Sequence, residues 1–223
     1  MPTSRERTLL GQFYTPRPVA DLLAALTLDR DPPTILDPGC GAGELLLAAH
    51  AHSPRATLAG IDIDPEAAAL ASTRLPRAHV TTGDFFAAPP VPTWDCILAN
   101  PPYVRSQQQD DRDPAARARL FAAASAAGVD ADPKTDLFAF FVYHALSVLK
   151  IGGRLGCITP ATWLTSRYAA TLQRVLTGPL RLTTIVASSA ESFIPAVDIH
   201  TLLLIADRTP DAPPSPITFV TLR

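Results

Sequence analysis

Cysteine is scarce in this sequence, and its spacing argues against two kinds of stabilising site. The three cysteines, Cys40, Cys96 and Cys157, are an odd number and include no CxxC pair. A disulfide framework and a cysteine-based zinc site are therefore both disfavoured, and the pattern is typical of a reducing cytosol. Cys96 and Cys157 stand inside apolar runs, so we expect them in the core rather than at a reactive site.

A long hydrophobic run is missing as well. No stretch of about 18 uncharged apolar residues occurs anywhere, and the segment Met1 to Leu10 carries two arginines but no apolar core. The sequence therefore contains neither a membrane span nor a secretory signal. We expect a cytoplasmic protein.

An excess of positive charge is the third absence. The chain has 19 Lys and Arg residues, only two of them lysines, against 21 Asp and Glu residues, which gives a formal net charge of -2 and a pI near 6.2. Domains that hold nucleic acid through their overall charge are basic. Any nucleic-acid partner of this chain must therefore be held locally or by something else.

Apolar residues, in contrast, are plentiful enough to build a core. Hydrophobic residues make up 47% and charged residues 18% of the 223 residues, and the mean hydropathy is +0.15. This composition is typical of a globular protein. The length suits one substantial α/β domain rather than two domains of ordinary size joined by a linker.

Short β-rich runs alternate with Ala/Leu-rich helical runs, a pattern that predicts a mostly parallel sheet with helices on both faces. We predict seven strands, at Thr34–Asp37, Leu58–Asp62, His79–Thr82, Asp95–Ala99, Leu155–Thr159, Thr183–Ala187 and Thr201–Ala206. We predict helices at Pro18–Thr27, Gly43–His52, Pro65–Arg74, Asp136–Leu149 and Ser166–Leu176, and an Ala-rich helix at Pro114–Ala127. The fold class is therefore α/β, with one domain over 1–208 that contains an insertion over 104–133, and a C-terminal linker or tail over 209–223.

A glycine-rich loop, DPGCGAG at 37–43, follows the first predicted strand and opens a helix. Gly39 and Gly41 thus lie at the carboxyl edge of the sheet, where open α/β folds bind ligands. A dinucleotide loop needs G-x-G-x-x-G to hold a pyrophosphate, and here the third glycine falls one residue early. Asp37 also disfavours an anionic pyrophosphate but suits a cationic sulfonium with an amino-acid tail. We therefore predict S-adenosylmethionine as the cofactor.

Two further acidic residues extend this predicted cofactor site. Asp62 ends the second strand in GIDID, where its carboxylate can accept hydrogen bonds from ribose hydroxyls. Gly83-Asp84-Phe85 follows the third strand and offers a carboxylate beside an aromatic ring. That combination suits the amino edge and the face of an adenine.

The fourth predicted strand ends in NPPY, at 100–103, which resembles the motif of amino-group methyltransferases. GQFYTP, LDPGCGAG, GIDIDP, GDFF and NPPY follow one another in the order found in N6-adenine DNA methyltransferases whose cofactor loop comes first. NPPYVRSQ, KTDLF, LKIGGRLGCITPATWL and FIPAVDIHTLLLI are similar to the catalytic half of type I and type IIG restriction-modification enzymes. The resemblance covers nearly all of 9–208. It implies a Rossmann-like fold of the S-adenosylmethionine-dependent methyltransferases, with 1–208 as the catalytic domain.

By this resemblance, the chain is expected to methylate the N6 amino group of an adenine that is flipped out of DNA at a specific site, in a restriction-modification or phage-defence system. Such an amino group is a poor nucleophile, because its lone pair is delocalised into the purine. The Asn100 side-chain oxygen and the Pro101 carbonyl can accept its two hydrogens. Pro101 and Pro102 stiffen the loop, and Tyr103 offers a stacking face for the flipped base. Positioning and electrostatics perform this chemistry, so no metal is predicted.

The resemblance also implies contacts along the cofactor. They are Tyr14 and Thr15 at the methionine end, Asp37, Gly39 and Gly41 at the amino-acid tail, Asp62 at the ribose, Ile63 at the adenine face, and Asp84 with Phe85 at the adenine edge and face. In one place the sequence departs from the family. Family members have an aromatic residue directly before the proline of a late F-P-x-V motif, but this chain reads Phe193-Ile194-Pro195. Phe193 shifts into stacking on the base, Ile194 replaces it, or Phe193 is simply part of the core.

The predicted insertion and the residues beside it carry the one local basic cluster of the sequence. It consists of Arg105, Arg112, Arg117, Arg119 and Lys134, interleaved with Asp110, Asp111, Asp113 and Asp136. The cluster is either a lid that contacts DNA phosphates or an ordinary solvated helix.

Other methyl acceptors also fit NPPY. Protein N5-glutamine methyltransferases use the motif on an amide nitrogen, although GQFYTP and the stretch from KTDLFAFF to ITPATWL disfavour that interpretation. The N4 amino group of cytosine in DNA is chemically similar to that of adenine. No cysteine follows a proline, so the Pro-Cys nucleophile of a 5-cytosine methyltransferase is absent.

DNA recognition is expected to need something more than this chain. Members of the family carry a target-recognition domain after the last strand or use a specificity subunit. Nothing after residue 208 is large enough for such a domain. A missing C-terminal domain or a specificity subunit is therefore the expected partner, beside double-stranded DNA. Without it, the chain binds the cofactor but does not methylate alone.

Overall fold

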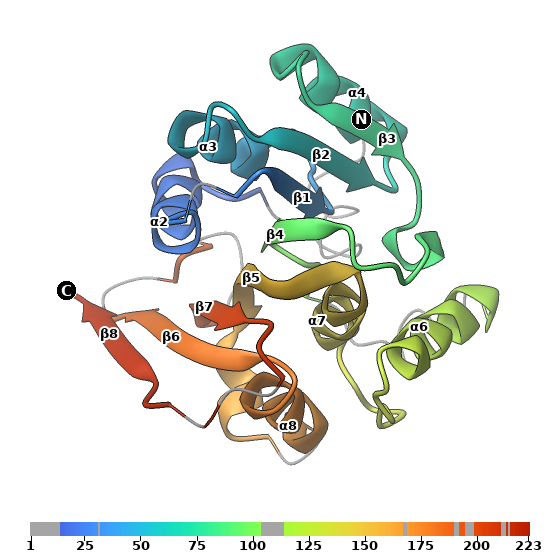
Figure 1. Ribbon diagram of the computed structural model, residues 1–223, viewed down its shortest axis with the longest axis vertical. Coiled ribbons are helices and arrows are strands. Elements are labelled where there is room, and N and C mark those ends of the chain that lie inside the picture. Colours follow the sequence, from blue (N-terminus) through green and yellow to red (C-terminus); the bar gives the residue numbers. More distant parts are fainter. Residues whose placement is uncertain are drawn as a thin grey trace.

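The computed structural model describes residues 14–30, 32–103, 114–166, 169–189, 192–194, 199–210, 213 and 215–223. They form one eight-stranded sheet in the order β3-β2-β1-β4-β5-β7-β6-β8 (Figure 1). The strands are β1 (Thr34–Pro38), β2 (Thr57–Asp62), β3 (His79–Thr82), β4 (Trp94–Ala99), β5 (Leu149–Pro160), β6 (Arg181–Ser188), β7 (Thr201–Asp207) and β8 (Thr218–Leu222). Strand β7 runs antiparallel to both of its neighbours, and the other neighbouring pairs are parallel.

Helices cover both faces of this sheet, as predicted. In the described residues they are α2 (Arg17–Thr27), α3 (Glu44–His52), α4 (Pro65–Arg74), α6 (Pro114–Ala126), α7 (Leu137–Val148) and α8 (Ala170–Thr177), with the 3-10 turns η1 (Phe85–Ala87) and η2 (Ala161–Leu164). Helices α2 and α3 lie on one side of the sheet, and α7 and α8 lie on the other (Figure 1). None of the helices in these ranges is long and apolar enough to cross a membrane.

The strand residues alternate between two hydrophobic clusters, one on each face. Ile35 and Leu98 pack with helices α2 and α3, whereas their chain neighbours Leu36 and Ile97 pack with α7. This division follows from the two-residue period of a strand, which sends successive side chains to opposite faces. It explains why β1 and β4 read as continuous apolar runs in the sequence. Cys96 and Cys157 are each 1% exposed, which confirms their predicted place in the core.

Local sequence signals account for most element boundaries. Helix α4 begins after Asp64, whose side chain accepts a hydrogen bond from the Glu66 backbone N–H, with Pro65 at the first helical position. All seven predicted strands and all six predicted helices are present. The largest shifts are in β5, which starts at Leu149 instead of Leu155, and in α8, which starts at Ala170 instead of Ser166.

The predicted number of strands, seven, is wrong by one. Strand β8 lies in the segment that was expected to be a tail, and it pairs in parallel with β6, from Thr184 opposite Thr218 to Ser188 opposite Leu222. All five residues of β8 are exposed. The sequence did not reveal this strand because it follows a proline-rich stretch and lacks a buried face.

Close packing of α2 against the sheet depends on one glycine. A methyl group on Gly156 in β5 would overlap the side chain of Thr27 in α2. Thr27 itself is 2% exposed and donates a 2.7 Å hydrogen bond to the Leu23 carbonyl within the helix. The absence of a side chain at Gly156 therefore lets α2 approach the strand, which positions the segment before α2 near the end of β4.

Candidate functional site

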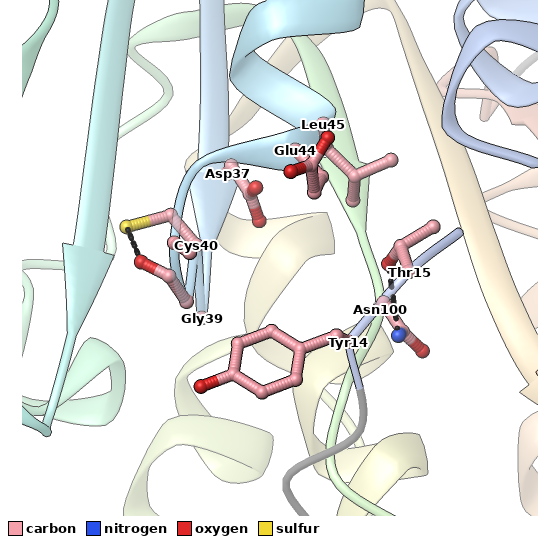
Figure 2. A pocket seen from close by; sticks show the side chains of 10 residues that line it. Tyr14, Thr15, Asp37, Gly39, Cys40, Glu44, Leu45 and Asn100 are labelled. Carbon is pink, nitrogen blue, oxygen red and sulfur yellow. Dashed lines mark hydrogen bonds between the residues drawn. The ribbon is translucent and has the colours of Figure 1, made fainter. Parts of the chain in front are cut away.

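The site lies at the edge where strands β1 to β4 end. These strands are parallel and adjacent, in the order β3-β2-β1-β4, so the residues that follow them meet at one edge of the sheet. A pocket there is lined by Tyr14, Thr15, Asp37, Gly39, Cys40, Gly41, Ala42, Glu44, Leu45 and Asn100. Figure 2 shows Tyr14, Asp37 and Asn100 around this one cavity. The structure thus brings together predicted cofactor residues and the predicted catalytic asparagine.

The glycine loop after β1 is held by its backbone. Gly39, Gly41 and Gly43 have φ angles of 119°, 50° and 86°, in the region that glycine adopts without strain. The Gly39 and Cys40 N–H groups donate to the Ile61 carbonyl at 2.7 and 3.0 Å. The turn therefore lies against the end of β2 and leaves its open side to the pocket.

Asp37, at the base of the pocket, carries the strongest electrostatic signal of the site. Its side chain is 1% exposed, and its Oδ1 has no hydrogen-bond partner among the described residues. Burial, and then the nearby Asp62 carboxylate, raise the pKa of Asp37 well above its usual value. A buried carboxylate oxygen without a donor is costly. A cationic ammonium group in the pocket would supply the missing donor and the opposite charge.

Asp62 and Ile63 follow β2 on the other side of the glycine loop. The Asp62 carboxylate accepts hydrogen bonds from the Gly41 N–H at 2.7 Å and the Asp64 N–H at 2.9 Å. Burial raises the pKa of Asp62, although these two backbone donors act in the opposite direction. Ile63 is 70% exposed, so its apolar side chain is available to a flat ligand.

Asp84 and Phe85 follow β3, but the two predicted adenine contacts differ in availability. Asp84 Oδ1 accepts from the Phe86 N–H at 3.0 Å, and Oδ2 accepts from the Arg119 guanidinium at 2.9 Å. The Phe85 ring is only 4% exposed and packs against the rings of Phe141 and His144, with centroids 5.5 and 4.6 Å apart. The Phe85 ring is therefore part of the packing beneath the Asp84 turn, and neither of its faces is accessible to an adenine.

The NPPY loop after β4 places Asn100 between two hydroxyl groups. The Asn100 Nδ2 donates to Thr15 Oγ1 at 3.0 Å, and the Tyr103 hydroxyl donates to Asn100 Oδ1 at 2.6 Å. Pro101 is buried and Pro102 is half-buried, which leaves the loop little freedom. Burial raises the pKa of Tyr103 well above its usual value, so its hydroxyl remains protonated. Thr15, predicted only as a cofactor contact, is thus also a partner of Asn100.

The predicted base-stacking position is not brought to the pocket. Phe193 and Ile194 are 7% and 0% exposed, and both pack in the hydrophobic cluster on the α2 side of the sheet. The next residue, Pro195, lies outside the described residues, as do residues 11–13 of GQFYTP and residues 104–113 with Arg105 and Arg112.

Two neighbours of the site, Phe141 and Arg119, were not among the predicted cofactor or catalytic residues; Arg119 was predicted only as part of the basic cluster. Phe141 in α7 lies beside the glycine loop, since a Cβ on Gly39 would be 3.7 Å from its ring. Arg119 in α6 pairs with Asp84, and Arg117 lies 5.2 Å from the centre of the Phe121 ring. KTDLFAFF marked the right segment for Phe141, but helical spacing alone does not tell which of its aromatic residues reaches the loop.

Comparison with known proteins agrees with this geometry. The sequence model of the N-6 DNA methylase family matches residues 2–223. The type II methyltransferase M.XamI of Xanthomonas campestris pv. amaranthicola is 31% identical over 175 residues, which are 74% of this chain and 33% of that protein. A release factor glutamine methyltransferase of Caulobacter vibrioides is 32% identical over a shorter stretch of 113 residues, 46% of this chain and 39% of that one.

The fold is shared with S-adenosylmethionine-dependent methyltransferases. The crystal structure of the methyltransferase subunit of a type I restriction-modification system from Streptococcus thermophilus superimposes with a TM-score of 0.68 at 22% identity, over 88% of this chain and 44% of that one. The chain spans about a third of the length of the type II methyltransferases M.XamI, M.CvrRI and M.TthHB8I, which it resembles. With a family match over nearly its whole length, the chain belongs to the N-6 DNA methylase family.

Proposed function

We propose that this chain is the catalytic part of an adenine-specific DNA methyltransferase, which moves a methyl group from S-adenosylmethionine to the N6 amino group of a flipped adenine. The observation that carries the proposal is the position of the Asn100 amide, at the wall of a pocket whose floor holds Asp37, a buried carboxyl whose Oδ1 has no partner among the described residues. An amide acceptor for the target amino group and an anionic floor for a cationic cofactor thus lie in one cavity. Membership of the N-6 DNA methylase family supports the same conclusion.

The residues of the pocket fit S-adenosylmethionine. Asp37 Oδ1 would accept from the α-ammonium group, with Gly39 and Gly41 leaving room for the amino-acid tail. Asp62 retains free lone pairs for ribose hydroxyls, because a carboxylate accepts about four hydrogen bonds. Ile63 would cover one face of the adenine, and Asp84 would accept from its amino edge. When bound, the cofactor supplies an electrophilic methyl group on a sulfonium sulfur.

The chain's own residues would activate the target amino group by orienting it. Asn100 Oδ1 and the Pro101 carbonyl would each accept one of its hydrogens, which favours a pyramidal nitrogen whose lone pair points at the methyl group. The two prolines hold these acceptors in place, so little reorganisation is needed during the transfer. Tyr103 would stack on the base once its ring is free.

Recognition of a DNA sequence is proposed to lie outside the residues described. The net charge of -2 does not favour binding of DNA by the chain as a whole. A specificity subunit or a further domain would supply recognition of the target sequence.

Methyl transfer from labelled cofactor tests the proposal directly. The protein is incubated with S-adenosylmethionine labelled in its methyl group and with mixed-sequence double-stranded DNA, and the DNA is then digested to nucleosides. N6-methyl-2′-deoxyadenosine in the digest supports the proposal, and Asn100→Ala should abolish it. Label in N4-methylcytosine would change the target base, and no label in DNA at high protein concentration would contradict the proposal for this chain alone.

A glutamine side chain is the second candidate acceptor. It is favoured by the similarity to the Caulobacter vibrioides release factor glutamine methyltransferase, which covers 46% of this chain. A glutamine-containing release factor offered in the same assay, in place of DNA, distinguishes the two. Label in the protein substrate but not in DNA would replace the first proposal by the second.

A further inference from the structure

A hydrogen-bonded chain joins three side chains, of which Thr15 and Asn100 line the pocket and Tyr103 packs against the hydrophobic cluster on the α2 side of the sheet. Asn100 Nδ2 donates to Thr15 Oγ1 at 3.0 Å, and the Tyr103 hydroxyl donates to Asn100 Oδ1 at 2.6 Å. Thr15 is 8% exposed and comes from the segment before α2, whereas the other two residues belong to the loop after β4. The two ends of the Asn100 amide are therefore hydrogen-bonded to side chains from two segments that lie far apart in the sequence.

The two hydrogen-bond partners determine which way the amide faces. Hydrogen bonds from a hydroxyl to an oxygen are commonly about 2.5 to 3.0 Å long, and those from an N–H to an oxygen about 2.7 to 3.2 Å. The 2.6 Å contact to Tyr103 lies in the first range, and the 3.0 Å contact to Thr15 is compatible with both, so the donor strength of the two hydroxyls decides the orientation. A phenol is a better donor and a poorer acceptor than an aliphatic hydroxyl. The oxygen of the amide therefore faces Tyr103, and its NH₂ group faces Thr15.

The orientation of the amide determines how the target base can contact Asn100. Asn100 Oδ1 is the atom that would accept a hydrogen of the target amino group, and in this structure it already accepts one from Tyr103. Burial raises the pKa of Tyr103, so the hydroxyl keeps its proton at neutral pH. An amide oxygen has two lone pairs, and the Tyr103 hydroxyl occupies one of them. That position becomes available to the target base when the hydroxyl leaves it.

We propose that the Tyr103 hydroxyl occupies the hydrogen-bonding position on Asn100 Oδ1 that the target amino group takes during the reaction. Thr15 is a positioning residue for the Asn100 amide. In this arrangement the Tyr103 hydroxyl donates a hydrogen bond to Asn100 Oδ1, while the hydrogen bond to Thr15 prevents the side-chain amide from rotating by 180°. The incoming amino group then exchanges with the hydroxyl, the amide stays where it is, and the freed Tyr103 ring can stack on the base. The identity of the incoming group rests on the proposed function, whereas the resting arrangement does not.

The resting arrangement can be tested without DNA or activity, because Asn100 is the only asparagine in the sequence. Labelling with ¹⁵N in asparagine side chains gives a single NH₂ pair in the NMR spectrum. Tyr103→Phe should shift this pair, and Thr15→Val should shift it and speed its exchange with water, with Thr15→Ser restoring the wild-type signals. The matched control is Tyr14→Phe, because the Tyr14 hydroxyl points toward the glycine loop (Figure 2). Unchanged signals in both Tyr103→Phe and Thr15→Val would overturn the proposal.

The exchange step is tested by single-turnover methylation of mixed-sequence DNA. Tyr103→Phe retains the stacking ring but has no hydroxyl to displace, so the KM for DNA should fall about fivefold, the effect of one net hydrogen bond. Thr15→Val should instead lower the maximal rate and leave the KM for DNA unchanged, and Thr15→Ser should recover it. A raised KM in Tyr103→Phe would contradict the proposed role of the Tyr103 hydroxyl. If the wild type methylates no DNA even with any specificity subunit added, the proposed function fails, while the NMR signals still decide the resting arrangement.

Discussion

Replacing Asp37 by asparagine should stabilise the cofactor-free protein and weaken cofactor binding. The Asp37 side chain is 1% exposed, and its Oδ1 lacks a partner among the described residues. Burial and the Asp62 carboxylate raise its pKa well above the usual value. An asparagine of the same shape carries no charge at any pH, so it avoids the cost of an ionised buried carboxylate.

The pH dependence follows from the direction of the shift. The pKa of Asp37 is raised in the folded protein, so the folded state keeps a proton that the unfolded chain loses near pH 4. The stabilisation is therefore complete below about pH 4, and it decreases by about 1.4 kcal/mol per pH unit until the folded-state pKa is passed. Asp37→Asn undergoes no such loss. Its advantage in Tm should grow with pH, at about 2–4 °C per kcal/mol for a chain of this size.

Cofactor binding should depend on pH in the opposite direction. An ammonium group against Asp37 favours the ionised carboxylate, so binding releases a proton wherever the free protein holds one. The Kd of the wild type for S-adenosylmethionine should fall by up to about tenfold per pH unit in that window. Asp37→Asn should bind at least about tenfold more weakly and show no such slope, since it has no proton to release.

Thermal unfolding and calorimetric titration between pH 5 and 8 measure both effects. Titration in two buffers of different ionisation enthalpy reports the proton released on binding. Asp130→Asn, at an exposed position after α6, is the matched control and should follow the wild type in both assays. A Tm difference for Asp37→Asn that stays constant with pH, or an unchanged Kd for the cofactor, would refute the assignment of Asp37.

Three further predictions concern stability. Gly156→Ala should lower the free energy of unfolding by about 1–3 kcal/mol in denaturant titration, because the added methyl group would overlap Thr27; an unchanged midpoint would show that α2 can move away at no cost. Burial lowers the pKa of His144, which is 1% exposed, so the wild type should lose stability as the pH falls below about 6.5. The free energy of unfolding of His144→Leu should depend less on pH between pH 7 and 5. Equal pH slopes for the wild type and the variant would contradict this. Asp207 is 1% exposed and its carboxylate is shared by the guanidinium groups of Arg154, Arg30 and Arg181, at 2.7, 3.1 and 3.3 Å. Asp207→Ala removes this shared carboxylate and should destabilise the protein by about 3–5 kcal/mol; a loss below about 1 kcal/mol would be inconsistent with a buried ion-pair network.

The order of strands and helices was predictable because each element has a local signal. Helix α4, for example, is marked by Asp64 and Pro65 at its start. Strand β8 was not predictable, because its pairing with β6 is decided by residues far away in the chain and its side chains have no buried face. The burial of Phe193 was not predictable for the same reason. The resemblance made this residue a candidate for base stacking, but it packs in the core.

The site was predictable as a set of residues but not as a set of contacts. The motifs identified Asp37, Asn100 and Thr15, and the structure brings all three to one pocket. The pair between Arg119 and Asp84 was not identified. Arg119 belongs to a helix in the insertion, and no spacing rule relates that helix to the end of β3.

The sequence by itself determined the order of the elements and the motif residues that mark the cofactor loop and the NPPY loop, because short-range patterns encode both. Only the tertiary structure decided that Asp37 Oδ1 is buried without a hydrogen-bond partner among the described residues. It also decided that Tyr103 and Thr15 bind the two ends of the Asn100 amide. These properties arise when segments from different parts of the chain exclude water from the same small volume. Burial and hydrogen-bond geometry are set there by neighbours in space, which no local pattern specifies.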